Sequence, residues 1–227
     1  WIEKYYIKGD VMYKVAIFDL DGTLLNTLKD LADACNFALR LYGFSEHQID
    51  EYKYFLGNGV YKLVERALPM DKKDGETVDK VLTEFKKYYE KHKSDFTKPY
   101  DGIEELLIAL KETGIKTAVV SNKPHEFAVE IVERYFGKSF DIVFGKREGY
   151  LAKPDPTTVI ETLNYFKCKK EEAVYIGDSD VDMFTGKNAG LFSIGVAWGF
   201  RGARELSAAG ANKIVYTSEE LLSEIIK

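Results

Sequence analysis

Carboxylates and other polar side chains follow several apolar runs of this sequence, at the points where the runs end. Asp19 and Asp21 follow the run at residues 15–18, where ordinary turn residues would be expected. The segment 121–123, Ser-Asn-Lys, ends a second run, and Asp178 ends a third. If these runs are strands of an open parallel sheet, their polar ends meet at one edge, because such sheets bind ligands beyond the carboxyl ends of the strands.

Three of these side chains are carboxylates, and their negative charges would repel one another in a shared site. Such a cluster destabilises the fold unless a cation offsets it, so Asp19, Asp21 and Asp178 predict a divalent metal. All of these donors are oxygens, and no His or Cys lies near them in the sequence. This donor set favours a hard ion such as Mg²⁺ over zinc.

The remaining polar groups of this edge suit an anion. Ser121, Asn122, Lys153 and the backbone N–H groups of the turn at Gly22 are hydrogen-bond donors. A metal and an ammonium together can neutralise a phosphate dianion in a site whose nucleophile is also negative. The residues therefore predict metal-assisted phosphoryl transfer, with a small phosphorylated metabolite as the substrate.

The secondary structure that must position these residues is predicted to be of two kinds, a helical segment followed by alternating strands and helices. Residues 27–94 show helical patterns only, including a first helix with Thr27 as its N-cap and Gly43 as its terminator. The segment Ser45–Gln48 has the form of a capping box. It predicts a second, shorter helix that ends near Gly57.

From residue 102 onward, apolar runs alternate with helical patterns. Strands that are apolar throughout and separated by helices indicate a parallel sheet covered on both faces. We therefore predict an α/β fold: a Rossmann-like core with helices on both faces and an all-helical cap inserted after the first strand. The predicted core spans residues 12–26 and 95–227, the cap spans residues 27–94, and residues 1–11 form an extension outside the fold.

Composition argues against several classes of protein. The chain has 227 residues and a formal net charge of −5, so we expect neither nucleic acid nor a membrane surface as a partner. No apolar stretch reaches the roughly 18 residues of a membrane span. The two cysteines, Cys35 and Cys168, lie far apart, as is typical of proteins from a reduced compartment. We expect a cytoplasmic protein, and the sequence makes no prediction of its oligomeric state.

Four short segments carry a resemblance to a known family. The segments "DLDGTLLNT", "VVSNK", "AKPDP" and "GDSDVD" follow one another in this order. Together they resemble the four motifs of the haloacid dehalogenase superfamily, specifically its phosphatase-like members with a helical cap after the first motif. The resemblance extends from about Met12 to Leu206. Asp21 stands two residues after Asp19, as in the phosphatases of this group and unlike most dehalogenases.

This resemblance implies a role for each matching residue. Asp19 resembles the nucleophile that takes the phosphoryl group as an aspartyl-phosphate. Asp21 resembles the general acid that protonates the leaving oxygen and then acts as the base that activates water. Ser121 and Lys153 would hold the transferring phosphoryl group, and Asn122 would assist them.

The same resemblance implies how the metal is held. Asp19 and Asp178 would contribute carboxylates, and the backbone carbonyl of Asp21 would face the ion. Asp182 would lie behind these ligands and orient Lys153 or a metal-bound water. The expected cofactor is therefore Mg²⁺.

The predicted cap would select the substrate. Residues 55–68, "FLGNGVYKLVERAL", and residues 196–202, "VAWGFRG", resemble segments of phosphoglycolate phosphatases. The nearest single substrate by resemblance is therefore 2-phosphoglycolate. Lys53, Lys62 and Arg66 are candidates to supply positive charge to a small carboxylated substrate.

Three other functions stay open at this point. A phosphomutase of the β-phosphoglucomutase type would return the phosphoryl group to a sugar, and a pyrophosphatase of the same group would differ only in substrate. From a different class, a phospho-accepting signalling module would be a switch without turnover. Lys153, the paired acid at Asp21 and a cap that encloses the site argue against the signalling module.

Overall fold

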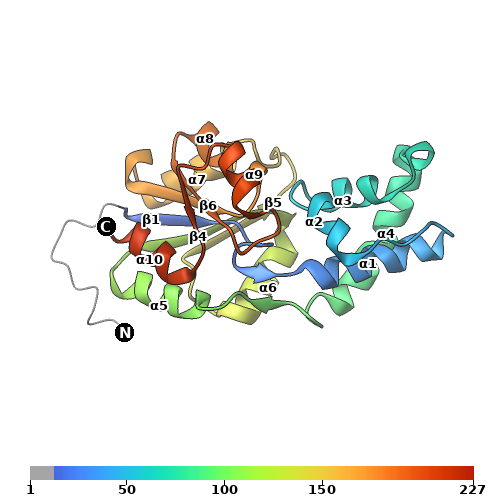
Figure 1. The fold of residues 1–227 in the computed structure, drawn as a ribbon, viewed down its shortest axis with the longest axis horizontal. Helices are drawn as coiled ribbons and strands as arrows, with labels where there is room; N and C mark the ends of the chain where they lie inside the picture. Colours follow the sequence, from blue (N-terminus) through green and yellow to red (C-terminus); the bar gives the residue numbers. More distant parts are fainter. Residues whose placement is uncertain (1–12) are drawn as a thin grey trace.

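The centre of the molecule is a six-stranded sheet, seen in a computed structural model that describes residues 13–227. The strands are β1 (Val15–Phe18), β4 (Lys116–Pro124), β5 (Ile142–Lys146), β6 (Ala173–Gly177), β7 (Phe192–Val196) and β8 (Lys213–Val215). They lie in the order β5-β4-β1-β6-β7-β8, and each neighbouring pair is parallel (Figure 1). The chain extends the sheet first on one side of β1 and then on the other. The carboxyl end of β1 is therefore at the switch point where open α/β sheets bind ligands.

Helices cover both faces of this sheet. They are α5 (Ile103–Glu112), α6 (His125–Phe136), α7 (Thr157–Phe166), α8 (Asp180–Ala189), α9 (Gly202–Ala208) and α10 (Ser218–Ile225). Along β1, Ala16 and Phe18 belong to the hydrophobic cluster under α5, α6 and α10, whereas Val15 and Ile17 belong to the cluster under α7. All four side chains are buried, because a strand covered on both faces has no solvent side. The predicted α/β class is confirmed.

A group of helices separates β1 from β4 in the chain and forms a distinct lobe, at the right of Figure 1. It consists of α1 (Leu28–Leu41), α2 (Tyr52–Phe55), α3 (Val60–Ala67), α4 (Gly75–His92) and the short 3-10 turns Ile49–Glu51 and Met70–Lys72. These helices bury a hydrophobic cluster of their own, with Tyr52, Leu63, Phe85 and Tyr89 near its centre. We call residues 28–92 the helical insert. The domain boundaries at residues 27 and 94 stay a prediction.

A small antiparallel pair joins the two connections between the sheet and the helical insert. β2 (Leu25–Asn26) precedes α1, and β3 (Lys98–Pro99) follows α4. Leu25 pairs with Pro99, and Asn26 pairs with Lys98. Sequence analysis did not predict this pair, because two residues are too few to show an alternating pattern.

Two predicted helix signals act differently in the structure. Thr27 occupies the N-cap position of α1, but its hydroxyl makes no capping bond and instead donates to Asp21 Oδ1 at 2.7 Å. The predicted capping box at Ser45–Gln48 is wrong, because the helical turn starts later. The Glu51 carboxylate accepts a hydrogen bond from the backbone N–H of Gln48 at 2.8 Å, so the box lies three residues further along the chain.

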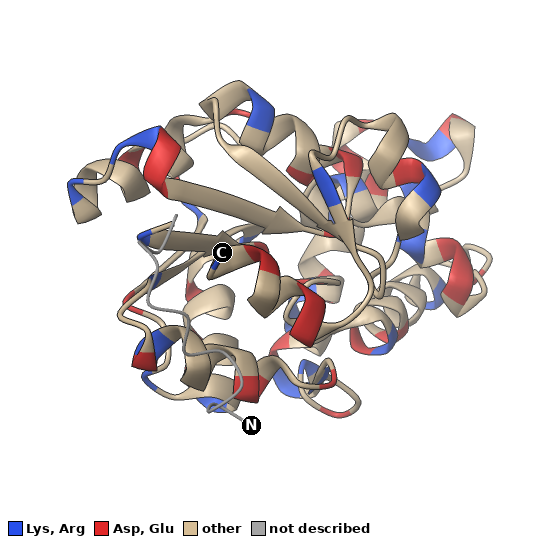
Figure 2. Ribbon diagram, turned by 60° about the vertical axis from the view of Figure 1, so that its left-hand side comes forward, with Lys and Arg blue, Asp and Glu red and all other residues tan. Residues whose placement is uncertain are grey.

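Charged side chains spread over the outside of the molecule. In Figure 2, lysines and arginines are interspersed with aspartates and glutamates over the helices, whereas β1, β6 and β7 contain no charged residue. No helix within residues 13–227 combines the length and the apolar character that a membrane crossing needs. The two cysteines, Cys35 and Cys168, are not joined in a disulfide.

Asp30 ties the start of α1 to the returning chain. Its buried carboxylate accepts hydrogen bonds from the backbone N–H of Phe96 at 3.0 Å and from the N–H and hydroxyl of Thr97 at 2.8 and 2.7 Å. Asp30→Ala leaves these donors without an acceptor, so we expect a loss of about 3 kcal/mol in the free energy of unfolding. Urea denaturation measures this loss, with Asp33→Ala as the control, because Asp33 is a partly exposed aspartate on the same helix whose ion pair with Lys29 contributes little. Equal stabilities of the two variants would contradict the expectation.

Candidate active site

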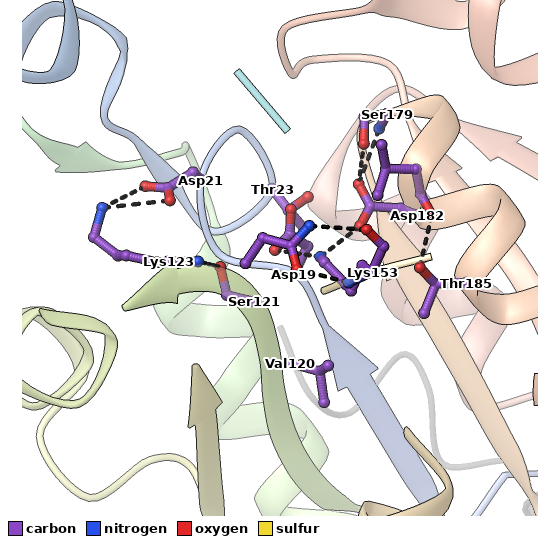
Figure 3. Close-up of polar contacts among 12 residues, drawn as sticks. Asp19, Asp21, Thr23, Val120, Ser121, Lys123, Lys153, Ser179, Asp182 and Thr185 are labelled. Carbon is purple, nitrogen blue, oxygen red and sulfur yellow. Dashed lines mark hydrogen bonds and ion pairs between the residues drawn. The ribbon is translucent and has the colours of Figure 1, made fainter. Parts of the chain in front are cut away.

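A chain of buried charges lies at the carboxyl end of β1 (Figure 3). Lys153 Nζ is 2.7 Å from Asp19 Oδ1 and 2.8 Å from Asp182 Oδ1. The backbone N–H and the hydroxyl of Ser179 donate to Asp182 Oδ2 at 3.1 and 2.6 Å. Asp182 is thus held from one side by Ser179 and directs the ammonium of Lys153 toward Asp19. The family resemblance implied this contact with Lys153 as one of two alternatives for Asp182, the other being a metal-bound water.

Asp178 lies next to Asp19 and Asp182, directly after the end of β6. The hydroxyl of Thr23 donates to its Oδ1 at 3.1 Å, and the backbone N–H of Phe200 donates to its Oδ2 at 2.7 Å. Gly22 lies directly against this carboxylate: a Cβ there would be 2.3 Å from Asp178 Oδ2, and the φ angle of Gly22 is +90°. Only glycine fits the turn at this point, because both the space and the backbone conformation exclude a side chain.

The carboxylates of Asp19, Asp178 and Asp182 offer oxygens that all lie within 4.8 Å of one another. Burial raises the pKa of Asp19 to about 7, and the charge of Asp182 adds to this effect while Lys153 opposes it. Burial, followed by the charges of Asp182 and Asp19, raises the pKa of Asp178 well above its usual range. Asp19 Oδ1, although paired with Lys153, accepts no well-directed hydrogen bond from residues 13–227.

The Asp21 carboxylate points away from these three aspartates (Figure 3). It accepts a hydrogen bond from Thr27 at 2.7 Å, and its two oxygens lie 3.1 and 3.3 Å from Lys123 Nζ. Lys123 also donates to the hydroxyl of Tyr89, on α4 of the helical insert, at 2.7 Å. The carboxylate of Asp21 is therefore placed where the sheet meets the helical insert.

The buried charges of this edge do not balance. The set contains four carboxylates and only two ammonium groups. The carboxylates are those of Asp19, Asp21, Asp178 and Asp182, and the ammonium groups are those of Lys123 and Lys153. When all are ionised, two negative charges have no partner within the set. A divalent cation offsets this charge, and oxygen ligands from carboxylates suit a hard ion. The residues present therefore fit the predicted metal.

Asn122 connects the site to the helical insert. Its side-chain amide donates to the carbonyl of Gly57, between α2 and α3, at 2.9 Å, and its Oδ1 accepts from the backbone N–H of Lys153 at 2.7 Å. Ser121 precedes it on β4 and is also buried. Gly59 approaches so closely that a Cβ would be 3.2 Å from the Asn122 carbonyl, and its φ angle is +85°. Gly59 thus allows the helical insert to approach β4 closely.

A pocket opens between this edge of the sheet and the helical insert. Its lining combines polar residues of the core with mostly aliphatic residues of the insert, namely Asp19, Asp21, Ser121, Asn122 and Lys123 on the core side and Leu31, Leu56, Gly57, Gly59, Val60 and Leu63 on the other. The pocket therefore has a charged floor and an apolar roof.

The basic residues suggested for substrate charge are engaged elsewhere. Lys53 and Lys62 form ion pairs with Asp50 and Glu65 at 2.7 and 2.6 Å. Arg66 donates to Asn58 and to backbone carbonyls of the loop between α2 and α3. None of the three lines the pocket. The cation that does line it, Lys123, was not among the predicted site residues, and its signal was its place two residues after Ser121 at a strand end.

Comparison with known proteins settles the family. The profile of the haloacid dehalogenase-like hydrolase family matches residues 16–196. The chain belongs to this family. The match includes all eight residues that the sequence singled out for this site, from Asp19 to Asp182. The predicted membership is confirmed, and the protein is an enzyme of the hydrolase type.

Curated relatives within the haloacid dehalogenase-like hydrolases carry a more specific name. The chain is 37% identical to a phosphoglycolate phosphatase of Aquifex aeolicus over 188 residues, which is 82% of this chain and 86% of the relative. It is 34% identical to a phosphoglycolate phosphatase of Psychrobacter arcticus, over 85% of this chain and 87% of that protein. A crystal structure from Lactobacillus delbrueckii subsp. bulgaricus has 36% sequence identity and a TM-score of 0.91, and the match covers 95% of this chain and 99% of that chain.

Proposed function

We propose that this protein is a Mg²⁺-dependent phosphatase that hydrolyses small phosphomonoesters through an aspartyl-phosphate, with 2-phosphoglycolate as its substrate. The observation that carries the proposal is the buried Asp19 carboxylate, held 2.7 Å from Lys153 on the floor of the pocket. The names of the relatives point to the same reaction. The predicted cytoplasmic location is part of this proposal.

The first half of the reaction uses Asp19 as the nucleophile. A carboxylate oxygen of Asp19 attacks phosphorus, and the bond between phosphorus and the ester oxygen breaks. Asp21 donates a proton to that oxygen, so the product leaves as an alcohol. Lys153 and Ser121 bind the phosphoryl oxygens, and the ammonium of Lys153 reduces the repulsion between the dianion and Asp19.

The second half returns the enzyme to its starting state. Asp21, now a carboxylate, removes a proton from water, and the water oxygen attacks phosphorus. The bond between phosphorus and Asp19 breaks, which releases inorganic phosphate and restores the Asp19 carboxylate. Asn122 keeps Lys153 in place through the hydrogen bond to its backbone N–H.

The metal would be held by the carboxylates of Asp19 and Asp178 and by the backbone carbonyl of Asp21. When bound, Mg²⁺ offsets negative charge on the phosphoryl oxygens and on the attacking group. Asp182 would stay behind these ligands, because Lys153 and Ser179 already engage both of its oxygens. The hydrogen bonds from Thr23 and Phe200 would fix the orientation of Asp178.

The pocket favours a small acid over a sugar. Its roof presents Leu31, Leu56, Val60 and Leu63, which have no polar group for the hydroxyls of a sugar. A buried hydroxyl without a partner is costly, so a phosphomutase that closes over a sugar phosphate fits this lining less well. The polar side chains of the pocket lie on its floor, where the phosphoryl group would bind.

The test is a comparison of phosphate release with Mg²⁺ from 2-phosphoglycolate, sugar phosphates, nucleotides and pyrophosphate. We expect 2-phosphoglycolate to stand out, with kcat/KM of about 10⁴ M⁻¹s⁻¹ or more. Similar slow rates for all substrates would contradict this choice of substrate. Pyrophosphate as the best substrate would favour a pyrophosphatase, and an isomerised sugar phosphate without free phosphate would favour a phosphomutase.

A further inference from the structure

Lys123 is a buried cation that the proposed reaction does not use. Its side chain is 2% exposed, yet it lines the pocket together with Asp19 and Ser121. It follows Ser121 by two residues on β4, so it lies beside the place proposed for the phosphoryl group. Its Nζ lies 3.1 Å from Asp21 Oδ1, and this ion pair favours the charged ammonium.

The hydrogen bonds of this ammonium fix its place in the pocket lining. Its Nζ lies 3.1 and 3.3 Å from the two oxygens of Asp21 and donates to the hydroxyl of Tyr89 at 2.7 Å. Tyr89 is a neutral partner, so Asp21 is the carboxylate that balances the charge of Lys123. A carboxylate of a bound molecule would form a charge-assisted hydrogen bond with the same ammonium, which is stronger than the bond to a neutral hydroxyl.

The two neighbours of Lys123 hold it in place. Asp21 belongs to the core, and Tyr89 belongs to α4 of the helical insert, where its ring is fully buried. The ammonium also lies 4.8 Å from the centre of the Tyr89 ring, within the range of a cation–π contact. Its position is thus set before any substrate arrives, as a specificity group requires.

We propose that Lys123 determines specificity by binding the carboxylate of the substrate. This inference rests on the proposed phosphatase function and names its substrate class, phosphomonoesters of short hydroxy acids. With the phosphoryl group on Asp19 and Ser121, the acid end of a two-carbon ester points along the floor to Lys123. Apolar side chains of the helical insert cover the carbon atoms between the two charged ends. Lys123 is the one cationic side chain in the pocket lining of the described residues. Lys153 is paired with Asp19 and Asp182 and serves the phosphoryl group in the proposed reaction.

The test compares two substrates that differ only in the carboxylate. These are 2-phosphoglycolate and 2-hydroxyethyl phosphate, which has the same two-carbon skeleton and a hydroxyl in place of the acid. We expect the wild type to favour 2-phosphoglycolate and Lys123→Met to lower this preference, the ratio of the two kcat/KM values, by about 100-fold. Any loss that arises from disturbing Asp21 affects both substrates and cancels in the ratio. Lys123→Arg keeps the charge and is expected to keep most of the preference.

Lys62→Met is the matched control, because Lys62 is a half-exposed lysine of the helical insert that lies outside the pocket. Its ratio should equal that of the wild type. If Lys123→Met does not fold, Tyr89→Phe serves instead: it removes one acceptor of the ammonium and should raise KM for 2-phosphoglycolate several-fold while leaving KM for 2-hydroxyethyl phosphate unchanged.

An unchanged ratio in Lys123→Met, or equal KM effects on both substrates in Tyr89→Phe, would overturn the inference. A wild type that hydrolyses both substrates equally well would also overturn it, while the phosphatase function would stand. A wild type that hydrolyses neither would instead refute the proposed function.

Discussion

Asp19→Asn is expected to lower kcat for phosphate release by about 10⁴-fold or more, the size of effect seen when a nucleophile is removed. The amide has nearly the same shape as the carboxylate but cannot form the phosphoenzyme. The fold should be retained, because burial and the repulsion from Asp182 both disfavour a charge on Asp19 and raise its pKa, and an uncharged side chain relieves both effects. Phosphate release and thermal unfolding of the same preparation measure both quantities.

The control for this experiment is Asp71→Asn, which changes an exposed aspartate of the helical insert in the same chemical way. It should retain wild-type turnover. Near-normal phosphate release by Asp19→Asn would refute its assignment as the nucleophile. A large fall in melting temperature would show instead that Asp19 is needed for folding.

Removal of divalent metal by EDTA is expected to lower activity by at least about 100-fold, and added Mg²⁺ should restore it. The physical reason is the charge of four aspartates that only two lysines offset, since this excess would hold a cation and would destabilise the metal-free fold. Mg²⁺ at a hundred times its dissociation constant should raise the melting temperature by about 5 °C. This shift can be measured without substrate.

Asp178→Asn distinguishes Mg²⁺ binding at the proposed site from nonspecific effects of the ion on stability. It removes one proposed ligand while leaving a side chain of the same size against Gly22, so it should fold and lose most of the Mg²⁺-dependent rise in melting temperature. Full activity after thorough chelation, or an equal Mg²⁺ shift in wild type and Asp178→Asn, would contradict the metal site.

The sequence predicts which residues meet at this edge of the sheet, because the strand ends follow from the apolar runs, whereas their roles in the reaction stay a prediction. Asp19, Ser121 and Asp178 come directly after such runs, and a parallel sheet brings those ends together. Lys153 does not come directly after a strand but lies in the loop between β5 and α7. The sequence offered it as an anion-binding donor, and the structure places its ammonium 2.7 Å from Asp19. The role of Asp182 toward Lys153 was implied by resemblance.

The contacts between the core and the helical insert were harder to predict. Lys123 has the same place in the sequence pattern as its neighbour Asn122, and only the fold brings Tyr89 against it. Thr27 carries a capping signal, but its hydroxyl finds a better acceptor in Asp21. Such contacts depend on how the helical insert packs against the core, and this packing cannot be predicted from helical periodicity or residue spacing.

The β2–β3 pair has a consequence for how this protein could change over evolutionary time. Because the outgoing and returning connections are hydrogen-bonded to each other, the helical insert begins and ends at almost one point of the core. Replacing it by another module with neighbouring ends would cost little loop-closure entropy and would leave the parallel sheet intact. The phosphoryl-transfer groups could then be retained while the roof of the pocket is exchanged, so new substrates could arise without rebuilding the chemistry.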